Sequence, residues 1–102
     1  MNFYVALLMG EIKREKLPMP IPEHRFDKVR RWRFDLAWPE QKIGLEVDGA
    51  VYAQGRHTRG AGFEKDTEKF NEAVLQGWRV LRYSTGQVKE GIPILDLKRV
   101  FA

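Results

Sequence analysis

Two runs in the middle of the chain alternate strictly between apolar and polar residues. In the first, residues 31–38, every even position is Trp, Phe or Leu. In the second, residues 43–48, Ile43, Leu45 and Val47 alternate with Gly, Glu and Asp. Such period-two alternation predicts half-buried strands. The four residues between them, PEQK, have the length of a common hairpin turn, so the pattern predicts an antiparallel hairpin.

The apolar residues also set the register of this hairpin. One alignment matches apolar residues at every position of one face, in the pairs Trp38–Ile43, Leu36–Leu45 and Phe34–Val47. A slip of one residue would set apolar against polar throughout, so this alignment is well specified. On the other face, the same alignment gives the pairs Ala37–Gly44, Asp35–Glu46 and Arg33–Asp48.

Helical and strand patterns flank the hairpin. Residues 2–17 predict a helix that Asn2 caps and two prolines end, and PMPIPE follows as a stiff connector. Residues 63–76 predict a helix that Gly77 closes, with one apolar face made by Phe63, Thr67, Phe70 and Val74. The other expected elements are an edge strand at 25–30, a glycine-rich loop at 49–62, a strand at 78–83 and a short helix at 92–101.

This order of elements predicts an α/β fold, in which a small mixed sheet with a central antiparallel hairpin is flanked by helices. The 102 residues suit one domain, 1–102. The chain has no cysteine, which excludes disulfides and thiolate zinc sites and favours a reducing compartment. The apolar stretch at residues 3–9 is too short to span a membrane and lacks the layout of a signal peptide. We therefore expect a cytoplasmic protein without membrane association.

Basic residues are clustered along the chain. The net charge is +4, and residues 24–34 hold five cations against the single acid Asp27: Arg25, Lys28, Arg30, Arg31 and Arg33. A second cluster, in the glycine-rich loop, consists of Arg56, His57 and Arg59. Clustered cations are expected of a phosphate-binding surface, and the alternative is a solvated face.

The predicted register sets two carboxylates, Asp35 and Glu46, directly opposite each other. Like charges at such positions destabilise a sheet, so something must offset their repulsion. A shared proton, a neighbouring cation or a bridging divalent metal would do so, and carboxylate oxygens are the ligands that Mg²⁺ or Mn²⁺ prefers. The alternative is a solvent-exposed pair that nearby arginines hold apart.

These residues resemble the D…(D/E)-X-K signature of the PD-(D/E)XK nuclease superfamily, because Asp35 is followed, after ten intervening residues, by Glu46-Val47-Asp48. The segments RRWRFDLAWPEQKIGLEVDG and GFEKDTEKFNEAVLQGWRVLRYS are also similar to very-short-patch-repair endonucleases and to phage endonuclease-like domains, and more distantly to junction resolvases. The likeness spans roughly residues 23–85 and implies a restriction-endonuclease-like fold. Short acidic motifs arise by chance, but the ordered match of strands, turn and helix is more specific.

The resemblance implies that Asp35 and Glu46 bind one or two divalent metals together with the main-chain carbonyl of Val47. The sequence departs from the family at Asp48, where the motif has a lysine. Asp48 is then either a third metal ligand or the ion-pair partner of Arg33. A replacement lysine could come from the predicted helix, at Lys69 or Lys65, with Lys69 preferred; the alternative is that both are solvated.

Two further residues have weaker assignments. Glu11 resembles, in position only, an extra metal-binding acid that some members of the superfamily carry on the first helix, and the alternative is a surface glutamate. His57 is a candidate general base or phosphate contact, and the alternative is an exposed side chain. No nucleotide-binding loop, dinucleotide fingerprint or nucleophilic Ser or Cys arrangement appears, so no small-molecule cofactor is expected.

We therefore expect an endonuclease that hydrolyses DNA phosphodiesters with Mg²⁺ or Mn²⁺. The expected contacts to the DNA backbone are Arg30, Arg31, Arg33, Arg56, His57 and Arg59. A chain this short favours a branched or otherwise structured substrate, as in repair or recombination, cut by a homodimer. The rivals are a non-catalytic nucleic-acid-binding module on a degenerate nuclease fold and a structural partner protein.

Overall fold

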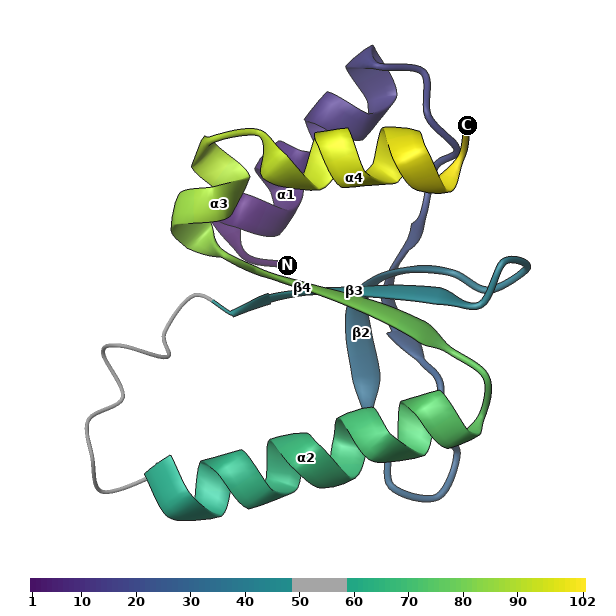
Figure 1. Ribbon diagram of the computed structural model, residues 1–102, viewed down its shortest axis with the longest axis vertical. Helices are drawn as coiled ribbons and strands as arrows, with labels where there is room; N and C mark the ends of the chain where they lie inside the picture. The colour runs from purple at the N-terminus through teal and green to yellow at the C-terminus, as the bar shows by residue number, and fades with distance from the viewer. Residues whose placement is uncertain (49–58) are drawn as a thin grey trace.

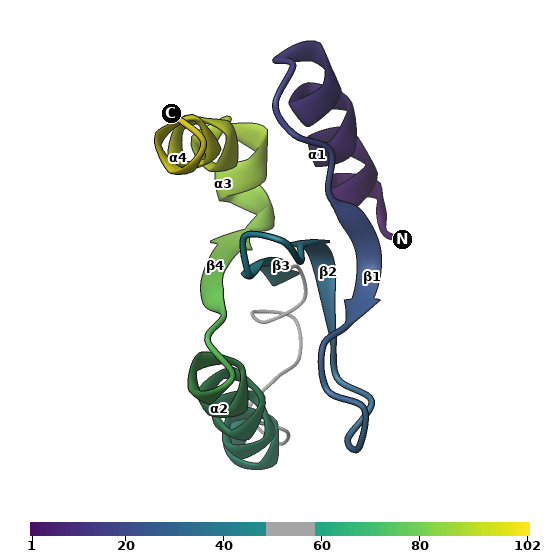
Figure 2. The ribbon, with the colours of Figure 1, turned by 90° about the vertical axis from the view of Figure 1, so that its right-hand side faces the viewer.

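A four-stranded sheet runs through the middle of the molecule, and helices lie on both of its faces (Figures 1 and 2). The structure is a computed structural model that describes residues 1–48 and 59–102, with the side chains of residues 59–61 outside the description. Its elements in chain order are α1 (Phe3–Arg14), β1 (Ile21–Arg25), β2 (Arg33–Trp38), β3 (Ile43–Asp48), α2 (Arg59–Leu75), β4 (Arg79–Ser84), α3 (Thr85–Lys89) and α4 (Ile92–Val100).

The strands follow one another in the order β1-β2-β3-β4. Next to its turn the β2–β3 hairpin has the predicted register, because Trp38 pairs with Ile43, Ala37 with Gly44 and Leu36 with Leu45. The other three predicted pairs, Asp35–Glu46, Phe34–Val47 and Arg33–Asp48, are not ladder pairs. β1 pairs antiparallel to β2, whereas β4 pairs parallel to β3. A parallel pair needs a crossover connection, and α2 lies in the segment that supplies it. The predicted mixed α/β sheet with a central antiparallel hairpin is thus confirmed.

The two faces of the sheet are covered by different helices (Figure 1). α1, α3 and α4 bury the larger cluster, which includes Leu36, Trp38, Ile43, Leu45 and Val47 of the hairpin. α2 covers the opposite face, where a smaller cluster consists of Phe26, Phe34, Ala37, Ala73 and Trp78. β3 is consequently buried on both faces. The face that the alternation predicts to be polar is therefore partly a second core.

Phe34 lies on the face opposite to the predicted one. Alternation places its ring with Leu36 and Trp38, but the ring packs over Gly44, where an added Cβ would lie 2.6 Å from it. The alternation is interrupted at Asp35, which falls between the β1–β2 pairs Pro22–Leu36 and His24–Phe34. Opposite this point Glu23 has a left-handed φ of 50°, so β1 is also irregular there. The irregularity turns Phe34 toward α2.

Several element boundaries differ from the predicted ones. The edge strand is Ile21–Arg25 instead of 25–30, so it includes the last three residues of the expected connector, and residues 26–32 form a turn. α2 begins at Arg59, so the expected loop is shorter at its C-terminal end. α3 was not predicted, although Ser84 and Gln87 form a capping box that is readable in the sequence. Gly77 ends the α2 region as predicted, with a φ of 90°.

α2 is also rotated relative to its predicted apolar face. Phe63 and Val74 are 67% and 63% exposed, so the predicted stripe is wrong at its two ends, whereas Thr67 and Phe70 are partly buried. Ala73 is fully buried, and Lys69 and Phe70 are partly buried on the same side. A lysine therefore lies on the face of α2 that meets the sheet. Among the described residues, no helix is long and apolar enough to cross a membrane.

Candidate active site

Asp35 occupies the irregular point of β2, where its carboxylate contacts β3. The main-chain N–H of Val47 donates to Oδ2 of Asp35 at 2.8 Å. The side chain thus accepts a hydrogen bond from β3 one residue beyond Leu36–Leu45, the last ladder pair between β2 and β3. This bond fixes the carboxylate beside the polar end of β3. It also means that an amide oxygen at position 35 could preserve the contact.

Glu46 is one residue before Val47 and is directed toward α2, because it shares the face of Gly44. The residue is only 8% exposed. Its Oε1 is paired with Nζ of Lys69. The Lys69 ammonium also lies 5.9 Å from the centre of the Phe34 ring and 5.5 Å from that of Phe70. The structure therefore brings together three predicted site residues, Asp35, Glu46 and Lys69.

Burial raises the pKa of Glu46 to about 7. Lys69 opposes this rise by pairing with the carboxylate, and the nearby Asp35 carboxyl adds to it through repulsion and a hydrogen bond. The two carboxyls thus lie close together, as predicted, although Asp35 and Glu46 are not a ladder pair. A positive charge between the two acids would therefore stabilise their ionised forms.

The raised pKa of Glu46 predicts how stability without metal depends on pH. Between about pH 4.5 and 7 the folded state binds more protons than the unfolded state, so stability falls as pH rises through 7. The raised pKa lowers the free energy of unfolding above pH 7 by on the order of 3 kcal/mol. We expect Glu46→Gln to gain stability relative to the wild type between pH 5 and 8, by several degrees in melting temperature measured in EDTA.

A matched control for this prediction is Glu15→Gln, which also removes a carboxyl paired with a lysine, Lys98. Lys98 lowers the pKa of Glu15, so its stabilising effect is complete above the unfolded pKa. The Glu15→Gln curve should therefore run parallel to the wild type over this pH range. A difference between Glu46→Gln and wild type that stays constant from pH 5 to 8 would contradict the assignment.

Asp48 contacts neither Glu46 nor the predicted partner Arg33. Nε and Nη2 of Arg82 lie 2.9 and 2.8 Å from its Oδ2, so the predicted Arg33 pair is wrong. Arg82 also lies 3.6 Å from Asp66 of α2 and 4.1 Å above the Phe70 ring. Arg82 was not among the predicted site residues, although alternation in β4 places it on the α2 side together with Val80.

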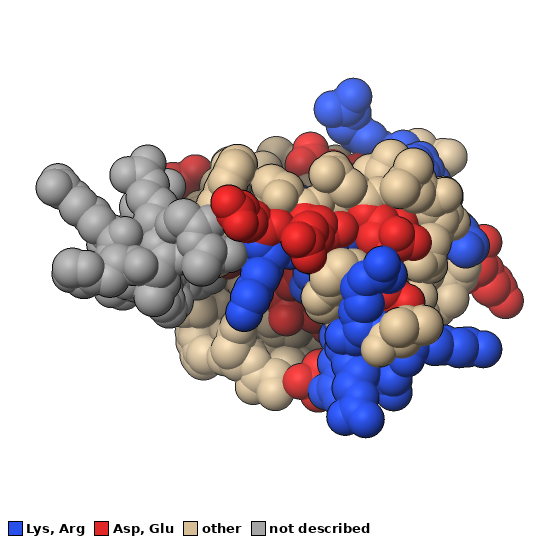
Figure 3. All heavy atoms as spheres, turned by 90° about the horizontal axis from the view of Figure 1, so that it is seen from below, with Lys and Arg blue, Asp and Glu red and all other residues tan. Residues whose placement is uncertain are grey.

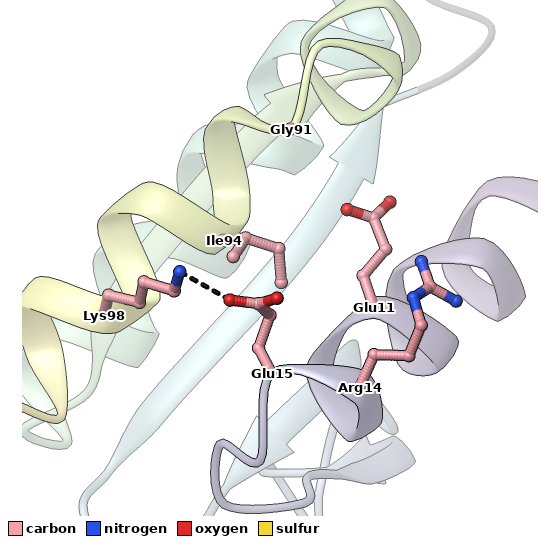
Figure 4. Close-up of a pocket in the computed structure, with 6 residues that line it drawn as sticks. All are labelled: Glu11, Arg14, Glu15, Gly91, Ile94 and Lys98. Atoms are coloured by element: carbon pink, nitrogen blue, oxygen red, sulfur yellow. Dashed lines mark ion pairs between the residues drawn. The ribbon is translucent and has the colours of Figure 1, made fainter.

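The remaining predicted site residues lie apart from this group. Lys65 is exposed on α2. Glu11 lies on α1, which covers the opposite face of the sheet, and it lines a groove between α1 and α4 (Figure 4). It is therefore not part of the candidate site. The assignments of Arg56 and His57 fall outside the described residues, as does the side chain of Arg59.

Three arginines, in the β1–β2 turn and at the start of β2, differ in how many protein groups they contact. Arg30 is paired with Asp27 at 3.0 Å and with Glu72 at 4.0 Å, and its guanidinium lies over the Trp32 ring. Arg31 and Arg33 are exposed. Of these three predicted DNA-binding residues, Arg30 thus contacts mainly protein groups, whereas Arg31 and Arg33 project into solvent.

The donor set of the candidate site fits a hard divalent cation. Asp35 and Glu46 supply carboxylate oxygens, and Val47 can add its main-chain carbonyl. Within the described residues, no three or more acids or histidines are grouped so that they could hold a metal ion together. Mg²⁺ is commonly bound by one or two carboxylates, with waters and substrate phosphates completing its shell, so two acids suffice.

Comparison with solved structures shows that the α/β fold of the molecule is similar to that of an endonuclease domain. The catalytic domain of the homing endonuclease I-Bth0305I matches 99% of this chain and 94% of that domain, with a TM-score of 0.69. The two sequences are 17% identical, so the likeness concerns the fold. No protein-family model matches the sequence, and no curated protein matches it.

Proposed function

We propose that the protein is a metal-dependent DNA endonuclease whose catalytic group consists of Asp35, Glu46 and Lys69. The observation that carries this proposal is the ion pair between Lys69 and the buried Glu46, beside Asp35. Two adjacent carboxyls and one lysine are the groups that the PD-(D/E)XK signature requires. Here the lysine comes from α2 instead of position 48. The fold shared with a homing endonuclease catalytic domain supports the same function.

Each residue has a distinct role in this proposal. Asp35 and Glu46 would hold Mg²⁺ or Mn²⁺, with the Val47 carbonyl as a further ligand. When bound, such an ion activates water and stabilises the charge that develops on the phosphate. The bond from Val47 N–H orients Asp35, and the rings of Phe34 and Phe70 flank the Lys69 ammonium. Lys69 would then exchange its contact with Glu46 for one with the reacting phosphate.

Asp48 has a different role in this proposal from the two that were predicted, metal ligand and partner of Arg33. Because Arg82 holds its carboxylate, Asp48 would act as a structural tie between β3 and β4. The proposal does not need it as a third metal ligand. A branched or structured DNA substrate and a homodimer remain part of the proposal, on the grounds of the family resemblance.

The test is whether the purified protein nicks or linearises supercoiled plasmid DNA. We expect cleavage when Mg²⁺ or Mn²⁺ is present and none when EDTA is in excess. Cleavage that persists in EDTA would contradict the metal dependence. Absence of cleavage together with tight DNA binding would favour the non-catalytic binding module.

A further inference from the structure

The turn between β1 and β2, residues 26–32, is fixed by hydrogen bonds around a buried acid. Asp27 accepts the main-chain N–H of Val29 at 3.3 Å and the guanidinium of Arg30 at 3.0 Å. Arg25 donates to the Lys28 carbonyl at 2.6 Å. The N–H of Phe26 donates to the carbonyl of Trp32 at 3.1 Å, which closes the base of the turn. These bonds hold the turn in one conformation.

Aromatic packing anchors the same turn in the smaller core. The Phe26 ring stacks on Phe34 with 4.3 Å between centroids and 12° between planes. Arg30 lies 5.1 Å from the Trp32 ring, which itself packs on the smaller core. The tip of the turn projects beyond the sheet (Figure 2). The side chains at the tip are therefore attached to a turn that packing and hydrogen bonds hold in place.

The tip carries an apolar side chain between cations. Val29 is 85% exposed, and Lys28 and Arg31 beside it are also exposed. The only acid of the turn, Asp27, is buried under Arg30. Seen from the α2 side, basic side chains gather in one region, whereas acids form a row (Figure 3). At spacings of four residues, α2 carries Glu64, Glu68 and Glu72. Glu72 of this row lies 4.0 Å from Arg30, so the acids border the turn on its α2 side, and DNA would contact the turn through Lys28, Val29 and Arg31.

We propose that the β1–β2 turn enters the major groove of DNA, with Lys28 and Arg31 on phosphates and Val29 against the base edges. This inference rests on the proposed function, because it takes DNA as the ligand. A two-stranded ribbon fits the major groove, which is about 12 Å wide. Apolar side chains in that groove contact the thymine methyl group. A rigid turn loses little conformational freedom on binding, which favours this role.

The position of the turn relative to the candidate site agrees with this docking mode. Arg31 precedes Asp35 by four residues, which is about 13 Å of extended chain. A phosphate backbone held at Arg31 would thus pass within reach of the two carboxyls. The turn would place the DNA, and the catalytic group would act on the adjacent phosphate.

The experiment measures binding in Ca²⁺, chosen to support binding without turnover, to a linear duplex of A·T pairs over a range of salt. For Lys28→Ala/Arg31→Ala, the slope of log affinity against log salt should fall by about two units. For Val29→Ala, affinity should fall by roughly 5- to 10-fold with an unchanged slope, because an apolar contact releases no counterions. Leu95→Ala on α4, where another aliphatic side chain is 61% exposed, is the matched control and should bind like the wild type.

A second duplex, with uracil in place of thymine, tests the groove. Wild type should bind it more weakly than the thymine duplex, and Val29→Ala should bind both equally. An unchanged salt slope in the double variant, or equal binding of both duplexes by the wild type, would overturn the docking mode alone. A wild-type protein that binds neither duplex would overturn the docking mode, and one that also fails to bind a four-way junction would overturn the proposed function.

Discussion

Asp35→Asn and Glu46→Gln should each reduce DNA cleavage by roughly 1,000-fold or more. The loss of a metal ligand removes several kcal/mol of transition-state stabilisation, and each tenfold change corresponds to about 1.4 kcal/mol. Both substitutions keep the shape of the side chain. Asn at position 35 retains an oxygen that can accept the Val47 N–H, so the irregular part of the hairpin should stay intact. Plasmid nicking under single-turnover conditions in Mg²⁺ measures the effect.

The control for these variants is again Glu15→Gln. It removes a carboxyl that is paired with a lysine, as Glu46 is, but on the helices that cover the opposite face of the sheet. Its cleavage rate should equal that of the wild type. Thermal unfolding must show that all three variants are folded. If Asp35→Asn or Glu46→Gln cleaves at a near wild-type rate under matched metal, the assignment of these carboxyls is wrong.

Lys69→Ala should lower the cleavage rate by on the order of 100-fold, whereas Lys65→Ala should change it little. Both lysines lie on α2, four residues apart, so the second is a matched control for charge and helix propensity. Only Lys69 is paired with Glu46. The expected loss lies in the chemical step, because Lys69 would neutralise the reacting phosphate. Single-turnover rates for both variants and for the double variant measure this.

Full activity of all three lysine variants would show that no α2 lysine replaces the one missing at position 48. In that case the proposed exchange of Lys69 between Glu46 and phosphate would be wrong. A large effect of Lys65→Ala with none for Lys69→Ala would require a different position of α2 in the DNA complex. Binding affinity in Ca²⁺ separates a loss of binding from a loss in the chemical step.

The hairpin could be predicted because its register depends only on the pattern of its own residues. Apolar residues at alternate positions, with PEQK between them, allow one good alignment. The face occupied by Phe34 could not be predicted in this way. It depends on the left-handed backbone of Glu23 in another strand and on the space that Gly44 leaves for the ring. Neither feature is visible in the alternation of β2 itself.

The candidate site, like the hairpin, could be predicted in part. The hairpin register placed Asp35 near Glu46, and helix spacing made Lys69 a candidate partner, which the structure brings to Glu46. The predicted Arg33 partner of Asp48 was wrong, because its actual partner Arg82 comes from β4, which is adjacent to β3 only through the parallel crossover. The residues that one strand pattern cannot reveal are those contributed by elements distant in the chain.

Direct titration of Mn²⁺ into the metal-free protein tests most directly whether Asp35 and Glu46 form a metal site. Calorimetry on the wild type, Asp35→Asn, Glu46→Gln and Glu15→Gln gives the comparison without requiring any DNA. We predict that wild type and Glu15→Gln bind Mn²⁺ equally and release protons at pH 6, because Glu46 must ionise to bind. Both site variants should bind at least 10-fold more weakly. Equal affinity of all four proteins would contradict the account.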